Sequence, residues 1–134
     1  MAIALSHRNP STRVIAVEPT DANAMALSVA AGEIVTLDKV PGTIADGLKP
    51  MAPGELTLEA ALEHVDRVLL VDDDSILRAQ RLLLERAKLL VEPSGAAGVA
   101  ALLGSHELAG LRVVTILTDR KSTRLNSSHT SISY

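Results

Sequence analysis

The sequence predicts an α/β fold in which a parallel sheet carries helices on both faces. Short apolar, β-branched runs alternate with longer runs of helical periodicity, which is the pattern of a sheet covered by helices. The last apolar run, residues 111–118, is hydrophobic throughout, as is typical of a parallel strand buried on both faces. The 134 residues are 47% hydrophobic and 1% aromatic, so we expect one small domain with an aliphatic core.

The chain begins with a predicted helix, strand and helix. Residues 1–7 favour a helix that ends before Pro10, because proline disfavours helix in the residue before it. Residues 12–17 are β-branched and apolar, as in a short buried strand. Residues 23–31 favour a helix that Gly32 terminates, since glycine readily adopts the left-handed conformation common at helix ends.

Residues 21–54 contain candidate caps for the second helix, a candidate strand and a predicted loop. Asp21 or Asn23 is the predicted N-terminal cap of the second helix, because both side chains can accept from free backbone N–H groups. Residues 34–37 are a candidate second strand. Residues 39–54 contain three prolines and three glycines, which indicates an irregular loop.

The middle of the chain predicts a further helix, strand and helix. Residues 54–65 have helical periodicity with Thr57 as a candidate cap, and residues 67–71 are an apolar strand. Three aspartates at residues 72–74 then open a long helix predicted to extend to Val91. Carboxylates are favourable at a helix N-terminus. Metal binding by the three aspartates is the alternative interpretation.

The predicted long helix delivers Glu92 to the start of a helix made of small residues. Pro93 suits the first turn, where its missing N–H would have no partner in the helix. Residues 94–103 are almost all small and include two glycines. Because glycine costs about 1 kcal/mol relative to alanine inside a helix, we expect another backbone or a ligand to approach closely here. The last predicted strand, residues 111–118, follows.

The composition excludes several classes of function. A formal net charge of −3 provides no basic surface for nucleic acid. The absence of cysteine excludes a disulfide framework and thiol chemistry. The apolar runs are too short to cross a bilayer, and the N-terminus lacks a signal-peptide pattern. We therefore expect a cytoplasmic protein without a membrane or nucleic-acid partner.

Three segments, in this order, resemble one enzyme family. They are Arg-Val-Ile-Ala-Val-Glu-Pro at residues 13–19, Thr-Ile-Ala-Asp-Gly-Leu at residues 43–48, and the run from Leu83 through Val-Glu-Pro-Ser-Gly-Ala-Ala at residues 91–97. Together they resemble the second half of the threonine dehydratase and serine racemase family. These are pyridoxal-phosphate enzymes of the tryptophan-synthase-β type. The resemblance covers residues 1–118 and implies part of a fold type II domain.

The resemblance implies a cofactor-dependent elimination. Such enzymes convert a hydroxy amino acid into a 2-oxo acid and ammonia, with pyridoxal phosphate as the electron sink and a lysine as its anchor. In the family, that lysine and the glycine-rich phosphate loop lie upstream of the residues matched here. Lys39, Lys49 and Lys88 do not match the lysine motif. We therefore expect this chain to be inactive by itself, and the full-length parent to be a homodimer with an amino-acid substrate.

Three residues match cofactor positions of the family. Gly47 stands where the family backbone passes the cofactor ring, and Glu92 lies beside the pocket. Thr118 occupies the position of a serine that contacts the pyridine nitrogen. The alternatives are an ordinary turn glycine at Gly47 and a helix cap at Glu92.

The resemblance also implies a possible divalent cation site. Some family members bind a cation through the equivalents of Glu18, the backbone carbonyl of Ala22, and an aspartate two residues further on. Ala24 occupies that last position, so the site lacks one of the oxygen ligands that hard cations require. The alternative is that Glu18 is a solvated carboxylate at the end of a strand.

Residues 119–134 do not continue the α/β pattern. They are polar and aperiodic, and from Asp119 to His129 they resemble the translation of a sequencing-adapter oligonucleotide. We expect residues 119–134 to be an unstructured, non-native tail. The alternative is a natural disordered tail.

Several functional hypotheses remain open. The first is that the chain is part of a threonine or serine ammonia-lyase. A serine racemase or a hydroxyaspartate dehydratase would share the same residues. The hypothesis of a different class is a non-catalytic, stand-alone α/β module. In-frame coding sequence for a glycine-rich loop and a lysine motif in the flanking DNA would favour an enzyme, whereas a native start and stop would favour the module.

Overall fold

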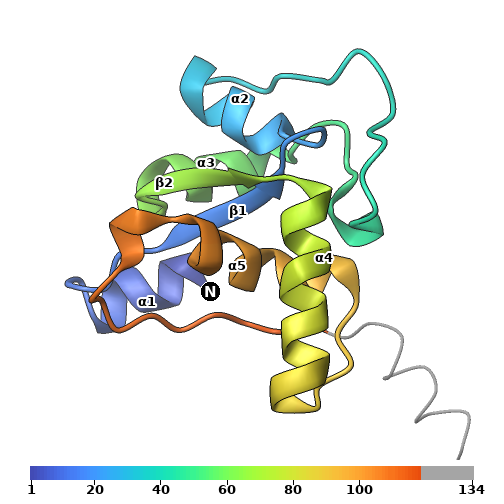
Figure 1. The fold of residues 1–134 in the computed structure, drawn as a ribbon. Coiled ribbons are helices and arrows are strands. Elements are labelled where there is room, and N and C mark those ends of the chain that lie inside the picture. The colour runs from blue at the N-terminus through green and yellow to red at the C-terminus, as the bar shows by residue number, and fades with distance from the viewer. Residues whose placement is uncertain (119–134) are drawn as a thin grey trace, which may run out of the picture.

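Two parallel strands form the centre of the computed structural model, which describes residues 1–118 (Figure 1). Strand β1 (Ile15–Pro19) pairs with β2 (Arg67–Val71) in a register that runs from Ile15 opposite Arg67 to Pro19 opposite Val71. Parallel strands require a long crossover, and here it contains two helices. The predicted α/β class with a parallel sheet is confirmed.

Within residues 1–118, five α-helices surround the strands. Helix α5 contacts both strands, and Figure 1 shows it on the opposite side of the strands from α2 and α3. Helix α4 follows β2 directly and packs along α5. The helices are α1 (Ala2–Arg8), α2 (Ala24–Ala31), α3 (Glu55–His64), α4 (Asp73–Leu82) and α5 (Pro93–Gly104). Within residues 1–118 none of them is long and apolar enough to cross a membrane.

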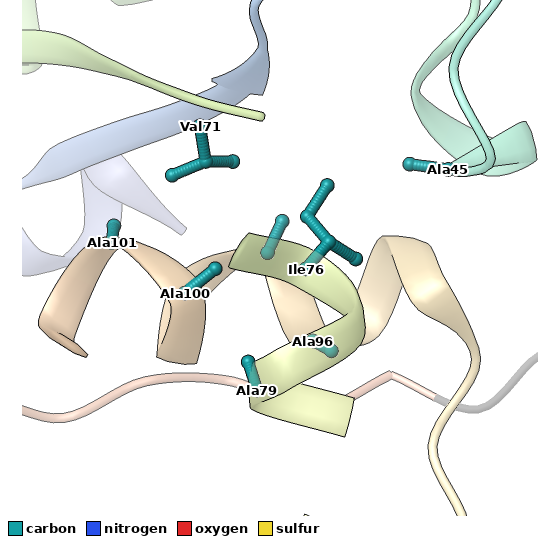
Figure 2. Close-up of a cluster of buried hydrophobic side chains, with 8 residues drawn as sticks. Ala45, Val71, Ile76, Ala79, Ala96, Ala100 and Ala101 are labelled. Carbon is teal, nitrogen blue, oxygen red and sulfur yellow. The ribbon is translucent and has the colours of Figure 1, made fainter. Parts of the chain in front are cut away.

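The core is aliphatic and consists mostly of alanine. Because alanine side chains are short, α4 and α5 approach closely under the end of β2. Figure 2 shows the Ile76 side chain between Val71 and Ala45, in the middle of the cluster. Ile76 is fully buried and is the largest such side chain in the described residues. The cluster consists of Ala45, Val71, Ile76, Ala79, Ala96, Ala97, Ala100 and Ala101.

The predicted long helix to Val91 is wrong in its second half. Helix α4 ends at Leu82, and a wider π-helical turn spans Leu83–Ala87. Lys88 then adopts a left-handed conformation with φ 59°, which ends the helical path. The side-chain amide of Gln80 donates to the carbonyl of Val91 at 2.6 Å and holds the returning chain against α4. Leu90 is therefore left exposed.

Two predicted strands are absent from the described residues. At residues 34–37, the Val35 N–H donates to Ser28 Oγ and the Leu37 N–H donates to the Met51 carbonyl. The N–H groups of Val35 and Leu37 thus have acceptors without a neighbouring strand. Residues 111–118 lack ladder pairing and instead run along α5 toward α4 (Figure 1). A strand needs a partner as well as an apolar pattern.

The helix termini agree only partly with the predicted caps. Gly32 ends α2 in the left-handed conformation, with φ 74°, as predicted. Asp72 caps α4 by accepting from the Ser75 N–H at 2.6 Å, and this hydrogen bonding lowers the pKa of Asp72. Thr57 is not the cap of α3, because that helix begins after Gly54 without a side-chain cap bond. The predicted tail, residues 119–134, lies outside the described residues.

Candidate functional site

The N-terminus of α5 carries the first predicted cofactor residue. Glu92 occupies the N-cap position with an extended backbone, and Pro93 starts the helix as predicted. Among residues 1–118, the Glu92 side chain makes no cap hydrogen bond. The simple capping role is therefore not what the structure supports. The half-buried carboxylate remains available to a ligand, at a helix end where negative charge is favourable.

The loop at residues 43–48 brings Gly47 to the same place. The Gly47 N–H donates to Ser94 Oγ at 2.9 Å. A Cβ added at Gly47 would lie 3.0 Å from Ser94 Oγ and 3.9 Å from Glu92 Oε1. Gly47 therefore leaves room where a side chain would press on the first turn of α5. The structure brings this predicted pair together across more than forty residues of sequence.

Thr118 reaches the first turn of α5 through its backbone. A Cβ at Gly95 would overlap the carbonyl oxygen of Thr118 and would lie 2.8 Å from Val91 Cγ1. The close approach that the glycines of α5 predicted is therefore confirmed. Gly47 thus bonds to Ser94 and Thr118 lies against Gly95, the two residues that follow the Glu92-Pro93 pair.

Two residues of this site were not predicted. Ser94 accepts the hydrogen bond from Gly47, and Asp73 accepts two hydrogen bonds from the start of the same loop. A serine in a first helical turn and an aspartate at a helix start each have a sufficient local explanation. The sequence contains no spacing signal that would link them to a loop about thirty to fifty residues away.

Glu18 lies near the C-terminal end of β1, and its side chain caps the N-terminus of α2. Its two carboxylate oxygens accept from the N–H groups of Met25 at 3.0 Å and Ala26 at 2.8 Å. Asn23 occupies the N-cap position as predicted, but its side chain forms no cap hydrogen bond, so the predicted side-chain capping is wrong and Glu18 does it instead. Burial raises the pKa of Glu18, and the two backbone hydrogen bonds only partly oppose that effect.

At the predicted cation site, the Glu18 carboxylate accepts hydrogen bonds from the backbone of α2. Both Glu18 oxygens already accept from N–H groups, so a cation would have to compete with the helix for them. Ala22 is buried, and residues 1–118 contain no cluster of three histidine, cysteine or carboxylate side chains that could hold a metal. Asp72 caps α4 through the Ser75 N–H, as predicted, whereas Asp73 accepts from the Thr43 hydroxyl and the Ile44 N–H of the loop, so these two carboxylates have different hydrogen-bond partners and share no metal-binding arrangement.

A hollow of about 270 Å³ separates the two predicted sites. Glu18 and Met25 form part of its wall on the α2 side, and Gly47 forms part of it on the loop side. The loop at residues 43–48 thus has α5 against one side and this hollow against another. The remaining lining residues are Ala24, Leu48, Pro50, Ala52, Pro53, Gly54 and Thr57.

The Glu18 environment predicts a pH dependence of stability. Because the folded-state pKa is raised above 4.5, folding favours the protonated carboxyl. The stabilisation of the fold by the protonated Glu18 carboxyl is therefore fully present below pH 4.5, and it is lost as the pH rises through the raised pKa of Glu18. We therefore expect the free energy of unfolding of wild type, minus that of Glu18→Gln, to fall between pH 4 and neutral pH. Urea titrations at several pH values measure it, and a difference that rises with pH would contradict the assignment.

Comparison with known proteins identifies the family. The family model for pyridoxal-phosphate dependent enzymes matches residues 1–119. Serine racemase of Oryza sativa subsp. indica is 45% identical over 106 residues, 79% of this chain and 31% of that protein. Catabolic L-threonine dehydratase of Escherichia coli strain K12 is 41% identical over 103 residues, 77% and 31% of the two chains. The chain thus spans about a third of the length of these relatives.

The solved structures agree with the sequence relatives. Maize serine racemase superimposes with a TM-score of 0.78 at 36% identity, over 98% of this chain and 43% of that chain. Among residues 1–118 the Glu92 carboxylate makes no cap bond, and together with the Gly47 backbone beside it this polar group is compatible with a ligand that carries polar atoms at its edge. From the matched residues and the shared fold, the chain belongs to the pyridoxal-phosphate dependent enzyme family.

Proposed function

We propose that residues 1–118 form one wall of a pyridoxal-phosphate pocket in an ammonia-lyase that acts on a hydroxy amino acid. The observation that carries this proposal is the meeting of Gly47 and Glu92 at the N-terminus of α5. The family resemblance implies a cofactor position for each of these two residues. The relatives include threonine dehydratases and an L-threo-3-hydroxyaspartate ammonia-lyase of Saccharomyces cerevisiae, which supports this substrate class.

Each residue of the wall has a distinct role in this proposal. When bound, pyridoxal phosphate withdraws electrons from the α-carbon of the substrate, which then loses its α-proton and β-hydroxyl, and hydrolysis yields a 2-oxo acid and ammonia. Because Gly47 has no Cβ, its loop can lie directly against the first turn of α5 beside Glu92, and in this proposal the backbone of that loop passes the flat face of the ring. Glu92 accepts hydrogen bonds at the edge of the pocket, and Thr118 supplies a hydroxyl at the end of the extended segment.

A hybrid enzyme tests the proposal. The aligned residues of this chain replace the matched 103 residues of the E. coli dehydratase, and 2-oxo acid release is measured with L-threonine, L-serine and hydroxyaspartate. We expect cofactor-dependent release from at least one of them. Glu92→Gln should lower kcat/KM at least about ten-fold, since a hydrogen bond to a charged group contributes about 1.5–3 kcal/mol.

The matched control is Glu85→Gln, because Glu85 is exposed and pairs with Arg81 at the far end of α4. It should leave kcat/KM unchanged. A folded hybrid that binds cofactor but only interconverts L- and D-serine would favour the racemase alternative. A folded hybrid that binds no cofactor would refute the proposal and favour the non-catalytic module.

The 134-residue chain by itself should not anchor the cofactor covalently. Lys49 pairs with Asp46 at 3.2 Å, and the Lys88 ammonium donates to the Glu85 carbonyl at 2.8 Å. These contacts direct the two ammonium groups to Asp46 and Glu85, and not to Gly47 or Glu92. We expect borohydride treatment with pyridoxal phosphate to leave no stoichiometric lysine adduct in the mass spectrum. A single lysine modified in full would contradict this prediction.

Three further expectations remain predictions. A divalent cation at Glu18 and the Ala22 carbonyl would have to share the carboxylate oxygens with the N–H groups of Met25 and Ala26. A homodimer is what the family resemblance implies for the full-length parent, and sedimentation of the hybrid tests it. The cytoplasmic location follows from the sequence pattern alone.

A further inference from the structure

Asp73 connects the start of α4 to the loop that carries Gly47. One carboxylate oxygen accepts from the Thr43 hydroxyl at 2.5 Å, and the other accepts from the Ile44 N–H at 3.0 Å. Both oxygens of one side chain are therefore used on two consecutive loop residues. Thr43 is only 2% exposed, so the Thr43 hydroxyl is shielded from water, whereas the bond from the Ile44 N–H lies at the surface. Hydrogen bonds to a charged acceptor such as the Asp73 carboxylate are stronger than those between neutral groups.

The Thr43 hydroxyl extends the connection along the loop. The hydroxyl oxygen accepts from the Ala45 N–H at 3.2 Å, and the hydroxyl group donates a hydrogen bond to Asp73. Ala45 is fully buried in the core cluster beside Ile76. Residues 43–45 are thus fixed by hydrogen bonds and by packing, and Gly47 follows two residues later with its bond to Ser94.

The three neighbouring aspartates have different surroundings. Asp72 caps α4 through the Ser75 N–H, so the helix does not need Asp73 for that purpose. Asp74 is exposed on the same turn. The Asp73 carboxylate instead points across to a segment thirty residues earlier in the chain.

We propose that Asp73 is a positioning residue that sets the loop at residues 43–48 against the N-terminus of α5. Through Thr43 and Ile44 it holds Gly47 at hydrogen-bonding distance from Ser94, next to Glu92. This inference rests on the proposed function, in which the backbone at Gly47 lies against the cofactor ring. Asp73 itself does not contact the ring.

Amide hydrogen exchange in the purified 134-residue chain tests the connection without cofactor. In Asp73→Ala we expect amide exchange at Ile44 and Gly47 to accelerate at least about ten-fold. The Ile44 N–H loses its acceptor directly, and the Gly47 N–H loses its bond to Ser94 because the loop is no longer held in place. Exchange in β1 and β2 should stay as in wild type. The matched control Asp74→Ala removes the same charge from the same turn and should leave Gly47 unchanged.

Threonine variants separate positioning from general stability. Thr43→Val keeps the shape and removes the hydroxyl, so it should accelerate exchange at Gly47 as Asp73→Ala does. Thr43→Ser restores the hydroxyl and should restore protection. If Asp73→Ala does not fold, Thr43→Val and Thr43→Ser decide the question by the same criterion. Unchanged Gly47 exchange in a folded Asp73→Ala or Thr43→Val variant would overturn the inference.

The hybrid enzyme keeps this inference distinct from the proposed function. If the parent hybrid binds pyridoxal phosphate, Asp73→Ala should weaken binding at least about ten-fold, and Asp74→Ala should not. Equal binding by both variants would refute the role of Asp73 and leave the pocket assignment standing. A parent hybrid without cofactor binding would refute the pocket assignment, whereas the exchange experiment would still report on the loop.

Discussion

Replacing Ile76 with alanine should lower the free energy of unfolding by about 2–5 kcal/mol. Ile76 is fully buried between β2, the loop and α5, and most of its neighbours are alanines that cannot extend to fill a cavity. The loss is large compared with the total stability of a small domain, about 5–15 kcal/mol. Urea unfolding monitored by circular dichroism measures it.

The neighbouring residue provides the matched control. Leu77 lies on the same turn of α4, but 49% of it is exposed, so Leu77→Ala should cost far less. Equal losses for the two variants would mean that the cluster around Ile76 is not the centre of the core. A loss at Ile76 that also reduced the cooperativity of unfolding would still agree with its central position.

Replacing Gly47 with valine should abolish most of the activity of the hybrid enzyme. Even a single Cβ would lie 3.0 Å from Ser94 Oγ, and the valine methyl groups would extend further toward the first turn of α5. The loop must move away, which breaks the Gly47–Ser94 hydrogen bond. Because a displacement of about 1 Å at a catalytic site can cost on the order of 10²-fold, we expect kcat/KM to fall by that amount.

Gly42→Val is the control for this substitution. Gly42 lies at the start of the same loop, and a Cβ there would meet nothing within 4 Å. The variant introduces the same side chain without displacing the loop, so kcat/KM should remain near that of the parent hybrid. A similar loss in both variants would show that the loop tolerates no valine and that the α5 contact has no special importance.

Local patterns predicted the features that depend on local chemistry. The Gly32 helix end, the Pro93 start of α5 and strand β2 follow from residue type and periodicity, and all three are confirmed. The close packing of α5 followed from its glycines, because a helix retains them only where a neighbour needs the space. The family resemblance then supplied Gly47 and Glu92.

Features that depend on distant partners could not be predicted. Glu18 caps α2 only because β1 ends beside the start of that helix, and its sequence position suggests a solvated strand end instead. Likewise, the hydrophobic pattern of residues 111–118 gives no information about a pairing partner. The end of the π-helical turn at Leu83–Ala87 depends on the left-handed conformation of Lys88, and lysine is a residue type that gives no signal for that conformation.

The most direct test of the central claim is a crystal structure of the hybrid enzyme with pyridoxal phosphate bound. We expect the cofactor ring to lie against the backbone of Gly47, with the Glu92 carboxylate at its edge and the Asp73 contact to Thr43 and Ile44 intact. A ring bound away from both Gly47 and Glu92, in an active hybrid, would contradict the assignment of this wall to the cofactor pocket.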